Sequence, residues 1–254
     1  MLLVVSPAKN LNFEPAQAAL LTEPMFPKEA ASLARLARKL KAVDLIQLMG
    51  VSQRLAELNV QRFKAFKPGS SGGLQASFAF NGDVYRGLDA RSLDPEALSF
   101  AQDHLRILSG LYGVLRPLDG IQPYRLEMGV ELANAKGRNL YEFWGAKIAR
   151  ALNAAAAGQA DPTIVNLASI EYFAAVRVKA LKTPVLTCRF LEESEGQTRM
   201  ISFFAKRARG LMVRYAIDGR LERAEDLKGF DREGYGFRPE LSTKADWVFT
   251  RPAR

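Results

Sequence analysis

Short apolar runs bounded by turn residues predict strands along the whole chain. The run Leu2–Val5 is the clearest of them, because Ser6 and Pro7 end it. Further runs of this kind lie at 74–80, 163–167, 184–190, 198–204 and 247–250. Since a short polar stretch separates 184–190 from 198–204, these two runs predict a hairpin.

Apolar residues three or four positions apart predict helices. In 28–40, Leu33, Leu36 and Leu40 follow this spacing, with basic residues between them. Asp94 before Pro95 indicates the start of a helix that reaches residue 108. Further helices are expected at 44–49, 52–66, 139–157, 205–217 and, briefly, after Ser169.

The remaining segments read as connections. Residues 11–27 carry three prolines and predict an irregular excursion, and 111–124 predict an ordered loop. The Gly- and Ser-rich stretch 68–73 predicts a flexible loop. The mixture of a hairpin with strand–helix units favours an α/β (mixed α+β) fold, with one mixed sheet surrounded by helices. We expect a single domain over 1–254, with 28–67 as a helical hairpin insertion within it.

Cysteine and histidine usage excludes several classes of site. The 254 residues include one cysteine, Cys188, and one histidine, His104. A disulfide within the chain, a site built from several cysteines and a site that needs two histidines are therefore excluded. We expect no cofactor and no resident metal. The four apolar residues after Met1 are too few for a signal peptide or a membrane span, so we expect a cytoplasmic protein with no membrane partner.

Positive charge is concentrated in two blocks. The chain has 36 Lys and Arg against 27 Asp and Glu, a formal charge of +9. Residues 28–67 carry nine basic and three acidic side chains, a net charge of +6, and residues 199–254 carry thirteen and eight, a net charge of +5. This asymmetry favours a polyanionic partner, because bound phosphates release counterions. The alternative is a basic surface of solvated helix faces.

The segment 48–56 resembles a helix-hairpin-helix element. Such elements bind the DNA backbone and follow the pattern apolar-x-Gly-apolar-Gly-x-x-x-Ala. The matching positions are Leu48, Gly50, Val51 and Ala56, and Ser52 replaces the second glycine. The tight turn exposes backbone N–H groups and directs a helix N-terminus at a phosphate, and Arg54 would add a charge-assisted contact. A plain helical hairpin is the alternative.

The second basic block contains a helix rich in cations. Its candidate DNA contacts are Lys206, Arg207, Arg209 and Arg214. Like charges on one helix cost stability unless an anion or carboxylates neutralise them. Pairing with acidic side chains elsewhere in the fold is therefore the alternative to a phosphate.

A third group of polar residues occupies predicted loops. Lys9 and Asn166 lie near the ends of buried strands, where open α/β sheets place ligand sites. These residues either line one cleft, which would admit a small anionic ligand, or only tie loops together. The candidates are Ser6, Lys9, Asp83, Tyr85, Arg116, Asp119, Tyr124, Arg125, Glu127, Asn166, Ser169, Glu171 and Tyr172.

Familiar catalytic motifs are missing from the sequence. It contains no Walker A motif, and no Gly-x-Gly-x-x-Gly motif follows a predicted strand. Cys188 lies in the middle of a predicted strand with only Arg189 as a neighbouring cation. This setting indicates an inert buried thiol rather than a peroxide-reducing centre.

Seven segments, in order, resemble the YaaA family of peroxide stress proteins. They are Ser6–Lys9, Phe80–Ala90, Leu108–Asp119, Gln122–Gly129, Asn139–Gly145, Val165–Ser169 and Ala205–Met212. The sequence departs from the family pattern at Asn10, where Thr is common, and at Ser52. The resemblance implies a cytoplasmic bacterial protein that limits oxidative damage and is associated with low intracellular iron under hydrogen peroxide. It also implies a mixed α/β fold with a positively charged cleft, a helix-hairpin-helix element at 44–63 and DNA binding.

Two hypotheses follow from these observations. The first is a stress protein that contacts the backbone of double-stranded or structured DNA through the hairpin, Lys9 and the cations of 206–214, with little sequence specificity. The alternative is an enzyme for a small anionic or nucleotide substrate. Its active residues would be Lys9, Tyr124, Arg125, Glu127 and Asn166. A dedicated iron site made of carboxylates is disfavoured, since the acidic residues show no ligand spacing.

Overall fold

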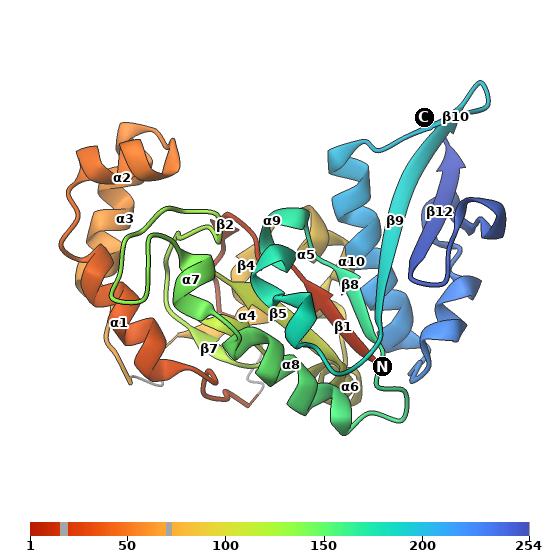
Figure 1. Cartoon of the computed structure of the whole chain (residues 1–254), viewed down its shortest axis with the longest axis horizontal. Coiled ribbons are helices and arrows are strands. Elements are labelled where there is room, and N and C mark those ends of the chain that lie inside the picture. Colours follow the sequence, from red (N-terminus) through yellow and green to blue (C-terminus); the bar gives the residue numbers. More distant parts are fainter. Residues whose placement is uncertain (16–19, 70–72, 254) are drawn as a thin grey trace.

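A computed structural model describes residues 1–15, 20–69 and 73–253 (Figure 1). Its central sheet has eight strands in the order β11-β12-β9-β8-β1-β5-β6, with β10 paired to β9 outside this path. These strands are β1 (Leu2–Val5), β5 (Leu105–Ser109), β6 (Gly113–Leu115), β8 (Ile164–Leu167), β9 (Val185–Ser194), β10 (Gln197–Arg199), β11 (Gly236–Phe237) and β12 (Asp246–Pro252). Two small sheets pair β2 (Asn10–Leu11) with β4 (Phe80–Asn81) and β3 (Leu74–Gln75) with β7 (Gly120–Ile121).

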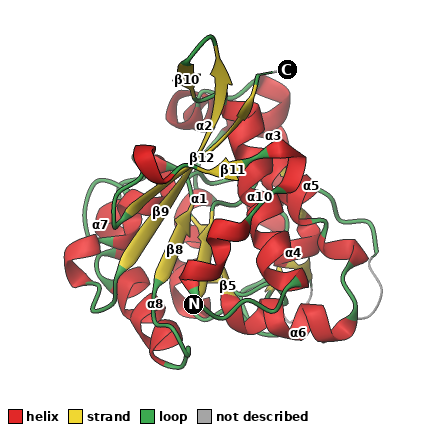
Figure 2. Cartoon of the chain, turned by 90° about the vertical axis from the view of Figure 1, so that its right-hand side faces the viewer, coloured by secondary structure: helices red, strands yellow, loops and turns green. Residues whose placement is uncertain are grey.

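The centre of the large sheet is parallel. β1 lies between β5 and β8, β8 continues to β9, and β9 pairs with β12, all in parallel. β6, β10 and β11 are antiparallel additions. Helices lie on both sides of this sheet (Figure 2), so β1, β5 and β8 are buried along their whole length. The carboxyl ends of these three strands therefore share one edge of the sheet, and the loops after them meet there.

The helices confirm the mixed α/β class. The α-helices are α1 (Pro27–Ala37), α2 (Ala42–Met49), α3 (Gln53–Ala65), α4 (Ala76–Ala79), α5 (Asp83–Leu88), α6 (Pro95–His104), α7 (Leu140–Trp144), α8 (Lys147–Ala157), α9 (Ile170–Phe173) and α10 (Ser202–Asp218). Short 3-10 turns are η1 (Ala90–Ser92), η2 (Ala174–Val176), η3 (Val178–Ala180), η4 (Ala224–Gly229), η5 (Arg232–Gly234) and η6 (Pro239–Leu241). α1, α2 and α3 fill the segment expected to be a helical insertion, and α2 and α3 lie at one end of the long axis (Figure 1).

The prediction of one continuous strand at 74–80 is wrong. The segment is a two-residue strand, the one-turn helix α4 and another two-residue strand. All four residues of α4 are buried, and the N–H groups of Ala76 and Ser77 donate to the carbonyls of Asp119 and Pro117. These long-range bonds replace a sheet ladder. The flexible loop predicted at 68–73 lies partly outside the described residues, at 70–72.

Four other segments differ from the prediction. The helix that Asp94 caps ends at His104, and the following residues form the fully buried β5; a run buried on all sides has no periodicity that separates strand from helix. The predicted helix 139–157 is two helices, α7 and α8, which meet at a turn after Trp144. The hairpin exists as β9 and β10, but Ser202 already begins α10. The loop predicted at 111–124 contains β6 and β7.

Candidate functional site

The turn between α2 and α3 holds four of the predicted site residues. Gly50 ends α2 with a φ of +61°, a backbone conformation that favours glycine. Val51 is buried and packs with Leu45 and Ala56 in a small cluster of its own. Ser52 is the N-cap residue of α3, and its side chain accepts no hydrogen bond there. The Ser52 side chain therefore does not occupy the first N–H groups of α3, and Arg54 lies exposed beside them.

The basic residues of 28–67 lack acidic partners among the described residues. Within residues 1–15, 20–69 and 73–253, none of the nine Lys and Arg side chains of 28–67 has a carboxylate oxygen within 4 Å. The three acidic side chains of the block bind other groups. Glu29 pairs with Lys147, Asp44 accepts from the Lys41 N–H at 2.8 Å, and Glu57 accepts from Gln53 at 2.6 Å.

Asn59 joins the hairpin to the loop that contains Arg125. Its Nδ2 donates to the Arg125 carbonyl at 2.7 Å, and its Oδ1 accepts from the Arg125 N–H at 2.9 Å. Arg62, one turn further along α3, lies close enough to Arg125 for electrostatic repulsion. Burial, and then the charge of Arg125, lower the pKa of Arg62. The sequence analysis missed Asn59; its signal is a polar residue on the buried stripe of α3, between Ala56 and Phe63.

One carboxylate oxygen of Glu127 lies close to two of the predicted site residues, both of them cations. Its Oε1 lies 3.0 Å from the Arg125 guanidinium and 3.6 Å from the Lys9 Nζ. Its Oε2 is buried and has no hydrogen-bond partner in the described part of the chain. The neighbouring Tyr124 hydroxyl lies 2.6 Å from the Ser109 Oγ, and burial raises the pKa of Tyr124. Lys9, Tyr124, Arg125 and Glu127 therefore form one polar cluster beside α3.

Ser6 and Ser169 bind the loops at the carboxyl edge of the sheet to each other. The Ser169 N–H donates to the Ser6 Oγ at 2.9 Å, and the Tyr85 hydroxyl donates to the Ser6 carbonyl at 3.0 Å. Tyr172 donates its N–H to the Ser169 Oγ at 3.4 Å, and burial raises its side-chain pKa. Asn166 accepts from the Ala168 N–H at 2.9 Å. The bonds of Ser6 join the loop after β1 to the start of α9 and to α5.

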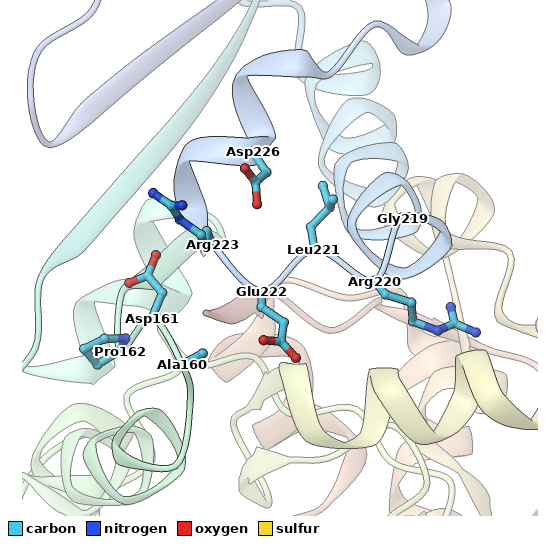
Figure 3. A pocket seen from close by; sticks show the side chains of 9 residues that line it. All are labelled: Ala160, Asp161, Pro162, Gly219, Arg220, Leu221, Glu222, Arg223 and Asp226. Carbon is cyan, nitrogen blue, oxygen red and sulfur yellow. The ribbon is translucent and has the colours of Figure 1, made fainter.

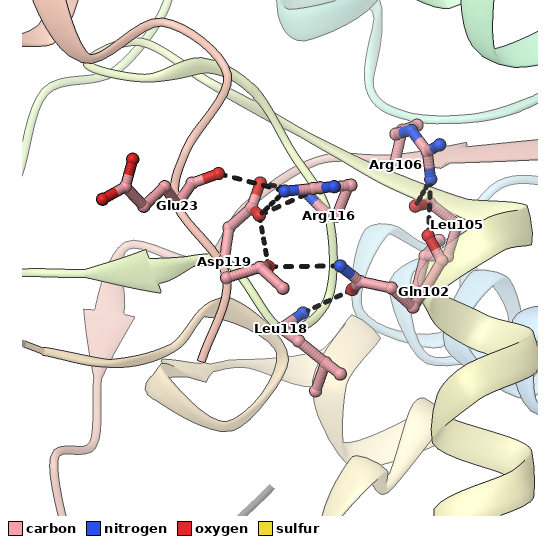
Figure 4. A network of polar contacts seen from close by, with 8 residues as sticks. Glu23, Gln102, Leu105, Arg106, Arg116, Leu118 and Asp119 are labelled. Atoms are coloured by element: carbon pink, nitrogen blue, oxygen red, sulfur yellow. Dashed lines mark hydrogen bonds and ion pairs between the residues drawn. The ribbon is translucent and has the colours of Figure 1, made fainter. Parts of the chain in front are cut away.

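Arg116 lies apart from the other loop candidates. β6 runs antiparallel to β5 with Leu115 opposite Ile107, so Arg116 lies at the amino end of β5, at the opposite edge of the sheet. Its guanidinium binds the buried Asp119 at 2.9 Å and the Glu23 carbonyl at 3.0 Å (Figure 4). Burial, and then the charge of Arg116, lower the pKa of the nearby Arg106 to about 10.

The cations of α10 are also distant from the hairpin. α10 packs on α5, beside β9, and the α2–α3 turn lies at the far end of the long axis (Figure 1). Arg207 binds Glu233 at 2.6 Å and Arg214 binds Asp218 at 2.7 Å. Burial lowers the pKa of Arg209. Lys206 is exposed. The carboxylate pairing that the sequence left open is present for Arg207 and Arg214.

A surface hollow of about 710 Å³ lies near Asp161 (Figure 3). Asp161 precedes β8, so the hollow lies at the amino edge of the parallel strands, and charges of both signs line it. None of the predicted site residues is among its lining residues. Over the described ranges, no three His, Cys, Asp or Glu side chains are grouped to hold a metal ion. No helix among the described elements has both the length and the apolar character to cross a bilayer.

Comparison with known proteins gives one family. Residues 1–241 match the family described as peroxide stress protein YaaA. A UPF0246 protein of Phenylobacterium zucineum is 63% identical over 253 residues, which cover 99% of this chain and 95% of the relative. UPF0246 proteins of Caulobacter vibrioides and of a Janthinobacterium species are 62% and 50% identical, each over 99% of this chain, and the matches cover 99% and 98% of those relatives. The match and these identities confirm the resemblance seen in the sequence: the chain belongs to the YaaA family of peroxide stress proteins.

Proposed function

We propose that this protein binds the backbone of double-stranded or structured DNA, with little sequence specificity, and thereby limits iron-dependent oxidative damage during peroxide stress. One observation carries the proposal: the nine basic side chains of 28–67, which lie on α1, on α3 and in the segments at their ends, have no carboxylate oxygen within 4 Å in the described chain. Such a surplus is stable beside a polyanion, which neutralises it and releases counterions.

The arrangement along α3 fits a run of phosphates. A helix rises about 1.5 Å per residue, so Ser52 and Arg62 lie about 15 Å apart along the axis. One DNA strand places a phosphate about every 3.4 Å of axis, so this distance covers about four phosphates. The N–H groups after Ser52 would hold one of them, and a phosphate near Arg62 and Arg125 would offset the repulsion between these two guanidiniums. Contacts of this kind carry no sequence information.

The polar cluster supports a second candidate, an enzyme acting on a small anionic or nucleotide substrate. Lys9 and Arg125 share a single oxygen of Glu127, and the buried Tyr124 and Tyr172 lie close enough to Glu127 to feel its charge. A phosphorylated small molecule would bind Lys9 and Arg125 by the same charge-assisted contacts. In this case inorganic phosphate or a mononucleotide should compete with duplex DNA at millimolar concentration.

The test of DNA binding is the dependence of affinity on salt. Fluorescence anisotropy with a labelled duplex should give a plot of log affinity against log salt with a slope of about −4 to −5, at about −0.9 per phosphate neutralised. Arg62→Ala should flatten the slope by about one, because it removes one phosphate contact. Arg214→Ala is the matched control, since its guanidinium already binds Asp218, and should leave the slope unchanged. A slope shallower than about −2 that Arg62→Ala does not alter would contradict the proposal.

A further inference from the structure

Ile170 exposes an aliphatic side chain beside the candidate site. It is the first residue of α9 and is 90% exposed. Burying such a side chain is favourable by about 1.5–3 kcal/mol. If Ile170 were on a mobile loop, its side chain could fold back onto the protein and become buried. We therefore ask whether the backbone on either side of Ile170 is held in place.

Both neighbours of Ile170 are fixed by hydrogen bonds to distant segments. The Ser169 N–H donates to the Ser6 Oγ at 2.9 Å. On the other side, Glu171 accepts from the Gly129 N–H at 3.0 Å through its Oε1, and from the Tyr141 hydroxyl at 3.0 Å through its carbonyl. The backbone on either side of Ile170 is thus held in place, and the side chain is presented to solvent on a rigid turn.

One short segment connects this turn with the cations of the hairpin. Residues 125–129 are bound at one end to Asn59 of α3 and at the other end to Glu171 of α9. A fully extended chain spans about 3.6 Å per residue, so Arg125 and Gly129 are at most about 14 Å apart. Arg125 and the turn that presents Ile170 therefore lie at the two ends of one short segment, and a duplex that contacts Arg125 and covers this segment would reach Ile170.

We propose that Ile170 inserts between bases of the bound DNA as an apolar wedge, so that the protein favours duplexes with a mismatched or unpaired step. This inference rests on the proposed DNA binding. The unpaired cations of 28–67 select a partner whose surface is anionic, and DNA offers an apolar interior to a side chain that separates two stacked bases. Unstacking costs least where pairing is already lost, and this difference produces the preference.

The experiment uses duplexes with 2-aminopurine beside a mismatch, whose fluorescence rises when the base unstacks. Anisotropy of a second label measures binding in the same sample, with the full-length protein at saturation. We expect a fluorescence rise with the wild type and none with Ile170→Ala. Affinity for the mismatched duplex should fall about tenfold, the order expected when an aliphatic contact is lost, and affinity for the matched duplex should not change.

Two further variants separate the wedge from indirect effects. Ile170→Phe should keep the fluorescence rise, because a larger apolar side chain still separates the bases. Leu241→Ala, at an exposed leucine of η6, which packs against β12, should behave as the wild type. Wild-type binding without a fluorescence rise, or a rise that Ile170→Ala retains, would overturn the wedge and leave DNA binding standing. The absence of any duplex binding would overturn both.

Discussion

The two basic blocks of this chain have similar net charge and opposite environments. In 28–67, no cation has a carboxylate within 4 Å among the described residues. In 199–253, the described part of the second block, seven of the twelve cations have one: Arg207, Arg214, Arg220, Lys228, Arg232, Arg238 and Arg251. Net charge counted along a sequence therefore overstates the charge that is available to a partner. The first block keeps all nine of its cations for an anion from outside, whereas the second block keeps a minority of its own.

Arg251 shows what arginine does in the second block. It is 2% exposed, lies between the rings of Phe204 and Tyr235, and donates to Glu192 at 2.8 Å. Glu233 binds both Arg251 and Arg207, which joins β12 to α10. These guanidiniums hold elements together.

Arg38 gives the contrast in the first block. Its guanidinium donates to the carbonyls of Phe63 and Phe66, at 3.1 and 2.6 Å, and so joins α1 to the end of α3. These acceptors are neutral, so the structural contact leaves the positive charge in place. The same residue type thus stabilises both regions, but it is neutralised in only one of them.

The largest effect we expect is a difference in the free energy of unfolding between two arginine variants, one from each block. Arg251→Met should lower the free energy of unfolding by about 3–5 kcal/mol, because it leaves the carboxylate of Glu192 buried and unpaired. Arg62→Met should leave it unchanged or raise it, because burial and the charge of Arg125 disfavour the charged form of Arg62 in the folded protein. Urea unfolding followed by circular dichroism measures both. Equal losses for the two variants would remove the distinction between the blocks.

Much of the fold could be predicted from the sequence where one face of an element is buried. α1, α2 and α3 have apolar stripes of helical period, and their boundaries agree with the prediction to within a few residues. Prediction failed at two fully buried segments, although the equally buried β1 was recognised because Ser6 and Pro7 end its run. β5 and α4 are buried on every side, so no periodicity exists to identify them, and their conformation is set by bonds to residues far along the chain.

The candidate site was predictable in its residue types but not in its partnerships. The loops after β1 and β8 meet because parallel strands end together, which the sequence suggested through Lys9 and Asn166. The pairing of Arg207 with Glu233 depends on how α10 meets η5, and the clamp between Asn59 and Arg125 depends on how α3 meets a loop 66 residues away. Packing across such separations leaves no local pattern. Arg116 was grouped with the wrong edge because the direction of β6 was unknown.

The next effect should arise in the α2–α3 turn. Gly50→Val should weaken duplex binding about tenfold, because a β-branched residue disfavours the φ of +61° and shifts the N-terminus of α3. Anisotropy with several unrelated duplexes measures it, and all should lose affinity alike. Gly196→Val in the β9–β10 turn is a matched control, since that φ is +73° and a Cβ meets no atom within 4 Å at either position. If both variants or neither lost affinity, the hairpin would have no special part in binding.

A smaller effect should follow from releasing cations in the second block. Asp218 binds Arg214 at 2.7 Å and Arg232 at 3.7 Å. Asp218→Asn should therefore raise duplex affinity at low salt about twofold, an exposed-pair effect that salt screens. Asp246→Asn, which releases Arg189 on β9, gives the same change in net charge at another place. Should the two variants bind equally, only net charge matters, and the location of the released cations does not.

The smallest effect is expected at Cys188, where the comparison predicts no role in protection. The thiol is buried in β9, and burial, with the charge of Asp246, raises its pKa, so little reactive thiolate forms near neutral pH. Cys188→Ala should lower the free energy of unfolding by about 1 kcal/mol and leave survival under hydrogen peroxide unchanged in cells that contain normal amounts of the protein. Arg62→Ala, at the same abundance, should reduce survival, because protection in this account depends on DNA contact. If only the cysteine variant lost protection, the protective function would depend on the Cys188 thiol and not on the unpaired cations of the first block.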